Sequence, residues 1–232
     1  MNISGFIPSS LLDYPHKVCC VVFTQGCNFH CPYCHNPELV PMKTPVADKG
    51  DMTPVFDFLE RRKGLLDAVV ISGGEPTLQK KLVTFLSRIK SMGFLVKLDT
   101  NGSRPQVLRA LLAEGFVDYV AMDIKASLGH YTPGITSQCD PKSLLTSIEL
   151  IMDSAPDYEF RTTCVKPFIT LESITEILQR IKGAKRYALQ TYRPKKILDS
   201  AFFEDCDPGC DQTDLKTFQS LALTYVDDCL IR

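Results

Sequence analysis

The sequence predicts an α/β fold, specifically a partial (β/α)6 TIM-like barrel with parallel strands inside and helices outside. Two observations lead to this prediction. Short, apolar, β-branched runs alternate with helical runs six times along the 232 residues. Hydrophobic residues make up 44% of the chain, which is enough for a substantial core. Six units are too few to close an eight-stranded barrel, and the pattern alone also allows a doubly wound sheet.

The predicted strands are short and apolar, as is typical of strands buried on both faces of a parallel sheet. They are Val18–Thr24, Ala68–Ser72, Leu95–Asp99, Tyr119–Asp123, Glu159–Val165 and Arg186–Gln190. Capping residues, prolines and glycines delimit the helices. These are Val55–Lys63, Gln79–Met92, Pro105–Glu114, Asp140–Asp153, Leu171–Lys182 and Thr213–Val226. Thr53 is predicted to cap the first helix, and Pro54 to occupy its first turn.

Charge and hydropathy exclude several classes of function. The net charge of −1 gives no reason to expect a nucleic acid or an anionic membrane as partner. No apolar run is long enough to cross a bilayer. The first fifteen residues lack the basic and apolar segments of a signal peptide. We therefore expect a cytoplasmic protein that binds neither nucleic acid nor membranes.

Three of the ten cysteines cluster tightly, directly after the first predicted strand: Cys27, Cys31 and Cys34. In a reducing cytosol, clustered cysteines mark a metal site more often than disulfides. Soft thiolates in a short loop select zinc, copper(I) or iron–sulfur clusters. Three thiolates leave one iron of a four-iron cluster without a protein ligand, and an open coordination position is where a cofactor or substrate binds.

The spacing of histidines and of the other cysteines allows alternative metal sites. His30 or His35 would complete a Cys₃His zinc site on spacing alone. Cys206 and Cys210 fit an auxiliary metal site, but two ligands without a third nearby favour an ordinary surface loop. The remaining cysteines are predicted to be small buried apolar residues. They are Cys19, Cys20, Cys139, Cys164 and Cys229.

Polar groups also follow the other predicted strands. Asp99 ends the third strand, Asp123 ends the fourth and Lys125 follows it. Arg161 lies inside an otherwise apolar strand, where a charge is rarely left unpaired, and Gln190 ends the sixth strand. Turns and solvated charges would explain these residues as well. Because ligands gather at the carboxyl ends of parallel strands, we expect these side chains to lie near the cysteine loop.

The cysteine loop, with Tyr33 directly before its last cysteine, resembles the signature of the radical S-adenosylmethionine (SAM) superfamily. The resemblance implies a [4Fe–4S] cluster on the three cysteines, whose open iron binds the amino and carboxylate groups of SAM. It implies reductive cleavage of SAM to a 5′-deoxyadenosyl radical, with Tyr33 against the adenine.

The run Gly73-Gly74-Glu75-Pro76 resembles a second motif of that superfamily. Glycines after a strand allow close backbone approach, although they are also common in plain turns. The resemblance implies that the backbone of this run and the carboxylate of Glu75 bind the methionyl amino group. A carboxylate next to an ammonium group is a charge-assisted contact.

The segments around Asp99 and from Asp123 to Lys125 resemble segments of glycyl-radical-enzyme activases. The resemblance implies that Lys125 meets the SAM carboxylate, and that the two aspartates help to hold a monovalent cation. Arg161 and Gln190 are further candidates for binding SAM, with pairing inside the protein as the alternative for both.

The stretches 5–15, 23–29, 34–39 and 189–194 are similar to anaerobic ribonucleoside-triphosphate reductase activating proteins. This similarity implies hydrogen abstraction from a glycine of that reductase, with reduced flavodoxin or ferredoxin as electron donor. We accordingly expect a radical SAM domain over residues 1–194 and a C-terminal extension over residues 195–232 packed on it.

Two other functions stay open. A small-molecule radical SAM enzyme, such as a 7-carboxy-7-deazaguanine synthase, requires a tight enclosed pocket for a heterocycle. A non-catalytic zinc or electron-carrier module would not bind SAM. An activase requires an open barrel, because a filled and closed barrel does not admit a glycine loop of another protein.

Overall fold

The computed structural model describes residues 1–41, 51–136, 140–193, 196–204 and 207–232. In these residues, eight strands form one sheet in sequence order. The strands are β1 Ile3–Ser10, β2 Cys19–Thr24, β3 Ala68–Gly73, β4 Leu95–Thr100, β5 Tyr119–Asp123, β6 Tyr158–Cys164, β7 Tyr187–Thr191 and β8 Cys229–Ile231. β1 pairs antiparallel with β2, and all later pairs are parallel.

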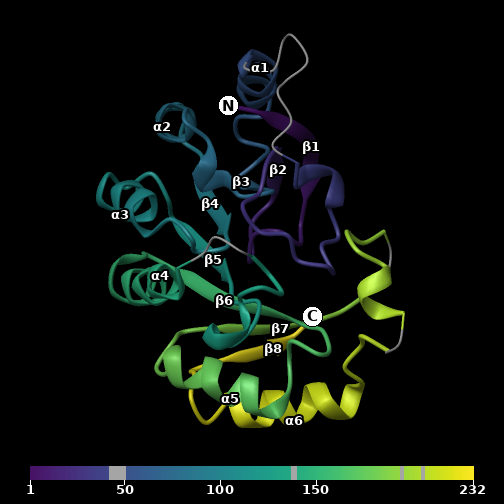
Figure 1. Cartoon of the computed structure of the whole chain (residues 1–232). Coiled ribbons are helices and arrows are strands. Elements are labelled where there is room, and N and C mark those ends of the chain that lie inside the picture. Colours follow the sequence, from purple (N-terminus) through teal and green to yellow (C-terminus); the bar gives the residue numbers. More distant parts are fainter. Residues whose placement is uncertain (42–50, 137–139, 194–195, 205–206) are drawn as a thin grey trace.

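Helices follow the strands and cover the outer side of the curved sheet (Figure 1). They are α1 Thr53–Arg61, α2 Leu82–Ser91, α3 Pro105–Ala113, α4 Pro141–Ser154, α5 Leu171–Arg180 and α6 Gln212–Ala222. In the described part of the chain, no pairing joins β1 to β8, so the barrel stays open between its first and last strands. The predicted partial barrel of parallel strands is confirmed, and each predicted strand and helix is present.

Three features differ from the prediction. β1 was not predicted, because it contains Pro8 and pairs on one side only, at the edge of the sheet. β8 was not predicted either, because it has only three residues. Thr53 is not the N-cap of α1: it lies inside the helix, Met52 is the N-cap, and the Asp51 carboxylate accepts the Thr53 N–H at 2.8 Å.

The two faces of the sheet have different chemistry. Residues such as Val22, Ile71 and Leu98 belong to the main apolar core, which includes the buried faces of the helices. Their neighbours in sequence point into the barrel, because side chains alternate along a strand. Near the amino ends of the strands the inner face holds a small cluster that includes Tyr14 and Tyr119, whose ring centroids are 5.3 Å apart. Charged side chains lie beside this cluster as well: Lys97 Nζ is 5.9 Å from the centroid of the Tyr119 ring.

The cysteines outside the predicted cluster are mostly buried. Cys19, Cys20, Cys164 and Cys229 are buried free thiols, as predicted. Cys210 is also buried, at 8% exposure, and packs in the main core rather than on a surface loop. Cys139 and Cys206 lie outside the described residues.

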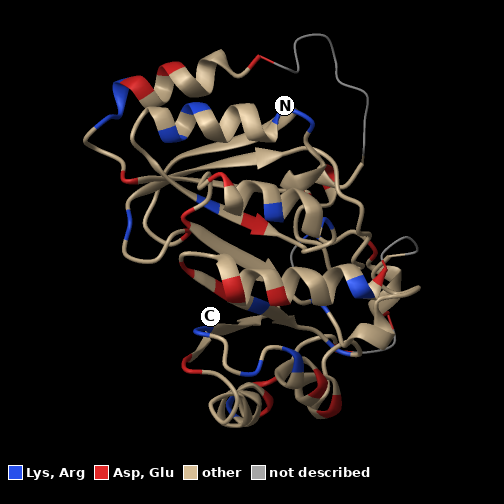
Figure 2. Ribbon diagram, turned by 90° about the vertical axis from the view of Figure 1, so that its left-hand side faces the viewer, with Lys and Arg blue, Asp and Glu red and all other residues tan. Residues whose placement is uncertain are grey.

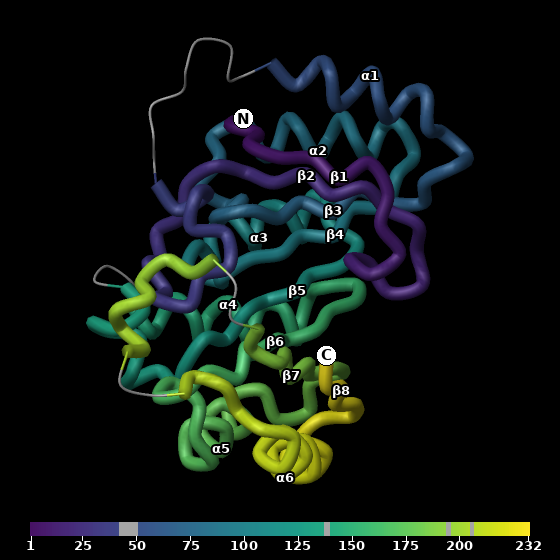
Figure 3. The backbone as a smooth tube through the Cα atoms, turned by 90° about the vertical axis from the view of Figure 1, so that its right-hand side faces the viewer, coloured from purple at the N-terminus to yellow at the C-terminus, as the bar shows by residue number. Residues whose placement is uncertain are grey.

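The C-terminal part of the chain returns to the cysteine loop. α6 packs against α5, β7 and β8. Before it, residues 196–204 run beside the segment that carries the cysteines (Figure 3). The Asp199 N–H donates to the carbonyl oxygen of Pro32 at 3.0 Å, and Phe202 stacks on Phe168 with ring centroids 5.5 Å apart. Residues 194 and 195, where the predicted domain boundary falls, lie outside the described residues.

The surface shows both signs of charge. Lysines, arginines, aspartates and glutamates are interspersed over the outer helices (Figure 2). None of the described helices has the length and apolar character that a membrane span requires.

Candidate active site

A cavity of about 270 Å³ opens at the carboxyl ends of the strands. Every residue that the sequence predicted for the site lines it, with the exception of Glu75. The predicted residues that line it are Cys27, Cys31, Tyr33, Cys34, Gly73, Gly74, Asp99, Asp123, Lys125, Arg161 and Gln190. Side chains that are far apart in sequence therefore lie together at the carboxyl ends of the parallel strands, as the sequence predicted.

The cysteine loop is held by its own backbone and by the segment that follows. The Gly26 N–H donates to Leu39 O at 2.8 Å, and the Cys34 N–H donates to Cys31 O at 3.0 Å. Burial raises the pKa of Cys27 to about 11 and that of Cys31 to about 12. Without a metal these two thiols are protonated at neutral pH, so metal binding would release protons.

The thiols share a cavity without converging on a single point. Among the described residues, no three His, Cys, Asp or Glu side chains are placed to hold one metal ion together. A four-iron cluster requires a different arrangement of thiolates, because each thiolate binds its own iron. Cys27, Cys31 and Cys34 fit this arrangement, because they are three soft donors that line one cavity.

Gly73 and Gly74 bring the end of β3 against the cysteine loop. A Cβ atom on Gly74 would lie 2.1 Å from the carbonyl oxygen of Gly26, and one on Gly73 would lie 2.2 Å from the backbone nitrogen of Thr24. Gly73 also has a positive φ of 119°. The sequence predicted close approach of the backbone to a ligand, but here the glycines allow close approach of two protein backbones, directly before Cys27.

Replacing Gly74 with alanine is expected to displace the cysteine loop, because the clash is with backbone rather than with a movable side chain. We expect a loss of about 1–3 kcal/mol in the free energy of unfolding. Urea unfolding followed by circular dichroism measures this loss. Gly129→Ala is the matched control, since a Cβ there has no neighbour within 4 Å. Equal unfolding midpoints for the two variants would contradict the proposed packing.

Glu75 lies behind the cavity wall. Its side chain is fully buried, and its carboxylate accepts the Asn101 N–H at 2.7 Å and the Thr100 hydroxyl at 2.8 Å. It also accepts the N–H of Thr77 at 3.0 Å. Burial raises the pKa of Glu75, although these hydrogen bonds act in the opposite direction. The carboxylate thus connects the end of β3 to the Thr100–Asn101 wall of the cavity.

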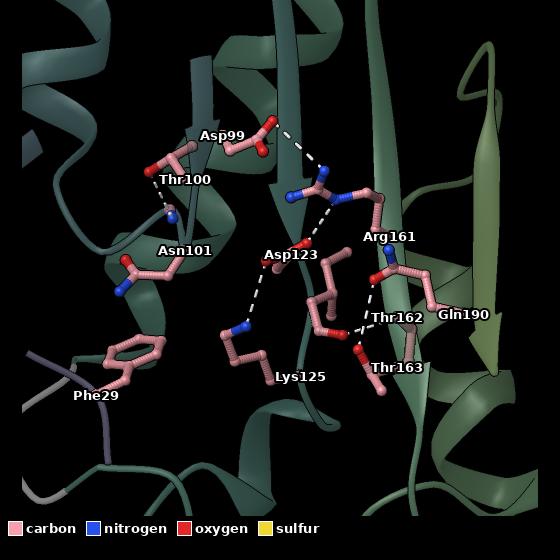
Figure 4. A network of polar contacts seen from close by, with 12 residues as sticks. Phe29, Asp99, Thr100, Asn101, Asp123, Lys125, Arg161, Thr162, Thr163 and Gln190 are labelled. Atoms are coloured by element: carbon pink, nitrogen blue, oxygen red, sulfur yellow. Dashed lines mark hydrogen bonds and ion pairs between the residues drawn. The ribbon is translucent and has the colours of Figure 1, made fainter. Parts of the chain in front are cut away.

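A chain of alternating charges crosses the inner face from β4 to β6 (Figure 4). Arg161 lies between two carboxylates: its Nε is 2.7 Å from Asp123 Oδ1 and its Nη1 is 3.4 Å from Asp99 Oδ1. At one end Lys125 Nζ lies 3.3 Å from Asp123 Oδ2. At the other end Lys97 Nζ lies 2.5 Å from Asp99 Oδ1. The alternative that Arg161 pairs with a core aspartate is therefore realised.

These pairs keep their members charged. Burial alone would raise the pKa of Asp123, but Arg161 and Lys125 outweigh burial and hold that pKa well below its usual value. Burial would lower the pKa of Lys125, yet Asp123 keeps it well above its usual value. Lys125 therefore presents a positive charge to the cavity at neutral pH.

Tyr33 and Gln190 both line the cavity. Tyr33 is buried, its hydroxyl donates to Lys125 O at 3.3 Å, and its ring lies 5.6 Å from that of Phe168. Gln190 Oε1 accepts the Thr163 hydroxyl at 3.4 Å. Several other lining residues were not among the predicted site residues. They are Phe29, Asn36, Val40, Ser72, Thr100, Asn101 and Thr163. His35, the alternative zinc ligand, also lines the cavity.

A family model described as the Radical SAM superfamily matches residues 21–181. The chain belongs to this superfamily. The recognition made from the cysteine loop is confirmed, and the superfamily implies a [4Fe–4S] cluster and SAM. The thiols, the buried aromatic ring and the positive charge of Lys125 fit both groups.

This radical SAM enzyme has similar relatives along its whole length. It is 36% identical to the "Putative glycyl-radical enzyme activating enzyme MJ1227" of Methanocaldococcus jannaschii, over 99% of this chain and 95% of that protein. It is 30% identical to the pyruvate formate-lyase-activating enzyme of Streptococcus mutans, over 74% of this chain and 70% of the relative. A more distant match is the 7-carboxy-7-deazaguanine synthase of Thermococcus kodakarensis, 28% identical over 77% of this chain and 76% of the relative.

The radical SAM fold also matches solved structures. SuiB from Streptococcus suis superposes with a TM-score of 0.68 at 13% sequence identity, over 91% of this chain and 48% of SuiB. The chain thus spans about half the length of SuiB. At this identity the likeness concerns the fold alone.

Proposed function

We propose that the protein is a radical SAM activase that abstracts a hydrogen atom from a glycine of anaerobic ribonucleoside-triphosphate reductase. The observation that carries the proposal is the 36% identity to MJ1227, which extends over nearly all of both chains. Stretches such as 5–15 and 189–194 are similar to activating proteins of that reductase. This similarity supports the reductase, among glycyl radical enzymes, as the partner. We further propose a cytoplasmic location and reduced flavodoxin or ferredoxin as electron donor.

The three thiolates of Cys27, Cys31 and Cys34 would hold three irons of the cluster. When bound and reduced, the cluster supplies the electron that cleaves SAM to methionine and a 5′-deoxyadenosyl radical, which takes the glycine hydrogen. The Lys125 ammonium group would bind the SAM carboxylate as a point charge. Asp123, 3.3 Å from Lys125, keeps that ammonium in place and protonated.

The other walls would position SAM. The buried ring of Tyr33 offers a flat apolar surface for the adenine. The backbone at Gly73 and Gly74 lines the cavity and would bind the methionyl amino group. Glu75 has its carboxylate occupied by Thr77, Thr100 and Asn101, so its contribution would be to hold this wall. Gln190, which also lines the cavity, would contact SAM or substrate.

The cavity extends toward the open side of the barrel. A second hollow of about 470 Å³ shares His35, Asn36, Thr163 and Gln190 with it and continues to Arg193. An extended mouth at this edge supports a polypeptide substrate, because a glycine in a loop must reach the cavity from outside. A deazaguanine synthase would instead enclose its heterocycle, and the distant match to that enzyme keeps it as the alternative.

The test mixes the anaerobically reduced holoenzyme with SAM and the reductase of the same organism. Electron paramagnetic resonance is expected to show a doublet that collapses when the reductase contains α-deuterated glycine. The deuterium is expected in 5′-deoxyadenosine, in amounts that match the radical. If a glycyl radical forms only on another glycyl radical enzyme, that enzyme is the partner and the proposed reaction stands. Reaction with a small heterocycle and with no protein would overturn the proposal.

A further inference from the structure

Lys97 is a fully buried cation that the activity proposed above does not use. It lies on the inner face of β4, its side chain is 2% exposed, and it does not line the cavity. Lysine is rarely buried so completely unless it is paired. Its partner is Asp99 Oδ1, at 2.5 Å, and that same oxygen receives Arg161 Nη1 at 3.4 Å.

The charges around Asp99 and Asp123 are already more than balanced. Each carboxylate has two cationic neighbours, Lys97 and Arg161 for Asp99, Arg161 and Lys125 for Asp123. Three cations and two carboxylates leave one net positive charge. A metal cation added here would meet repulsion from all three, in a region where low solvent exposure weakens screening.

We propose that Lys97 is a positioning residue whose ammonium group takes the place of a monovalent metal cation beside Asp99, so that the site needs no added cation. The resemblance to activases implied a cation held by Asp99 and Asp123, and the residues present do not fit one. The inference concerns the SAM site itself and does not depend on which protein or small molecule is the substrate.

A built-in ammonium group has a specific consequence for the network. Lys97 fixes Asp99, Asp99 and Asp123 fix the guanidinium of Arg161 from both sides, and Asp123 fixes Lys125. The positive charge that faces the cavity is thus set by the sequence. It does not vary with the ions in the medium.

The first test uses the native holoenzyme. Its thermal unfolding midpoint is expected to be the same in potassium chloride and in tetramethylammonium chloride of equal ionic strength. Crystals soaked in rubidium chloride are expected to show no anomalous peak between Asp99 and Asp123. A rubidium peak there, or stabilisation by potassium but not by tetramethylammonium, would overturn the proposal without any variant.

The second test is Lys97→Met, which removes the charge and keeps most of the length. This variant is expected to melt lower in tetramethylammonium and to recover by roughly 5–10 °C in potassium, as expected for a ligand that binds the folded state. Rubidium is expected beside Asp99 in its crystals. Lys90→Met is the matched control: it breaks the Lys90–Asp118 pair, at 2.7 Å and about a quarter exposed, and is expected to show no potassium-specific recovery. If potassium raises the unfolding midpoint of neither variant, Lys97 has only a structural role and the proposal is wrong.

Discussion

Replacing Cys27, Cys31 or Cys34 with alanine is expected to abolish SAM cleavage and to remove most of the bound iron. Two thiolates do not hold a four-iron cluster, and the three thiols line one cavity in the structure. Iron and sulfide analysis after anaerobic reconstitution measures the loss of the cluster. Chromatography of 5′-deoxyadenosine measures the loss of cleavage.

Cys210→Ala is the matched control for these three variants. Cys210 is a buried free thiol, and it does not line the cavity. Iron content and SAM cleavage are expected to stay at the native level in this variant. The cluster assignment is wrong if the native protein, reconstituted with both metals available, binds one zinc ion and no iron.

Replacing Arg161 with methionine is expected to cause the largest loss of stability among substitutions in the charged network. Arg161 is 12% exposed and pairs with both Asp99 and Asp123, so its removal leaves two partly buried carboxylates without their shared partner. Breaking such a pair from one side costs about 3–5 kcal/mol in the free energy of unfolding. Urea unfolding of the apoprotein measures it.

Arg186→Met is the control for Arg161→Met. Arg186 also pairs with an aspartate, Asp157, but the two side chains are 28% and 44% exposed. This pair is more exposed to solvent than the pairs of Arg161, and pairs at the surface contribute about 0–1 kcal/mol. Adding Asp123→Asn to Arg161→Met is expected to recover part of the loss, because the uncompensated charge is then gone. Equal losses for the two arginine variants would contradict the network as described.

The same variant is expected to change the dependence of stability on pH. Burial would raise the pKa of Asp99, but Arg161 and Lys97 lower it on balance, as Arg161 and Lys125 do for Asp123. A carboxyl with a lowered folded pKa adds stability above its unfolded pKa and loses it as pH falls through the folded value. The native protein is therefore expected to lose stability progressively below about pH 5, and Arg161→Met to lose less over the same range.

Much of the site could be predicted because its residues lie at strand ends. In a parallel sheet the carboxyl ends meet at one edge, so Asp99, Asp123 and the cysteine loop could be placed together from the strand pattern. Lys97 was not predicted, although it is a charge inside an apolar strand, the same signal that singled out Arg161. Its partner Asp99 lies two residues along the same strand, on the same face, and only the fold shows that Arg161 of β6 shares that carboxylate.

Glu75 and the glycines before it illustrate a different limit. The motif pointed to a ligand contact, whereas the carboxylate is occupied by donors from Thr77, Thr100 and Asn101. Two of these donors lie about one βα unit further along the chain, so only the folded arrangement reveals that Glu75 connects the end of β3 to the cavity wall. The contact of Glu75 with SAM stays a prediction. Edge strands β1 and β8 were missed because an edge tolerates proline and short length.

The hydrogen bond from Asp199 to Pro32 joins two parts of the chain that a ribosome makes at very different times. The loop that carries the cysteines is synthesised first, and residues 196–204, which run alongside it, are synthesised more than 150 residues later. Chains are made from the N-terminus onward, and earlier segments can fold first. During translation the cysteine loop is therefore made before residues 196–204, and this neighbour can pack on the loop only after both segments have been synthesised.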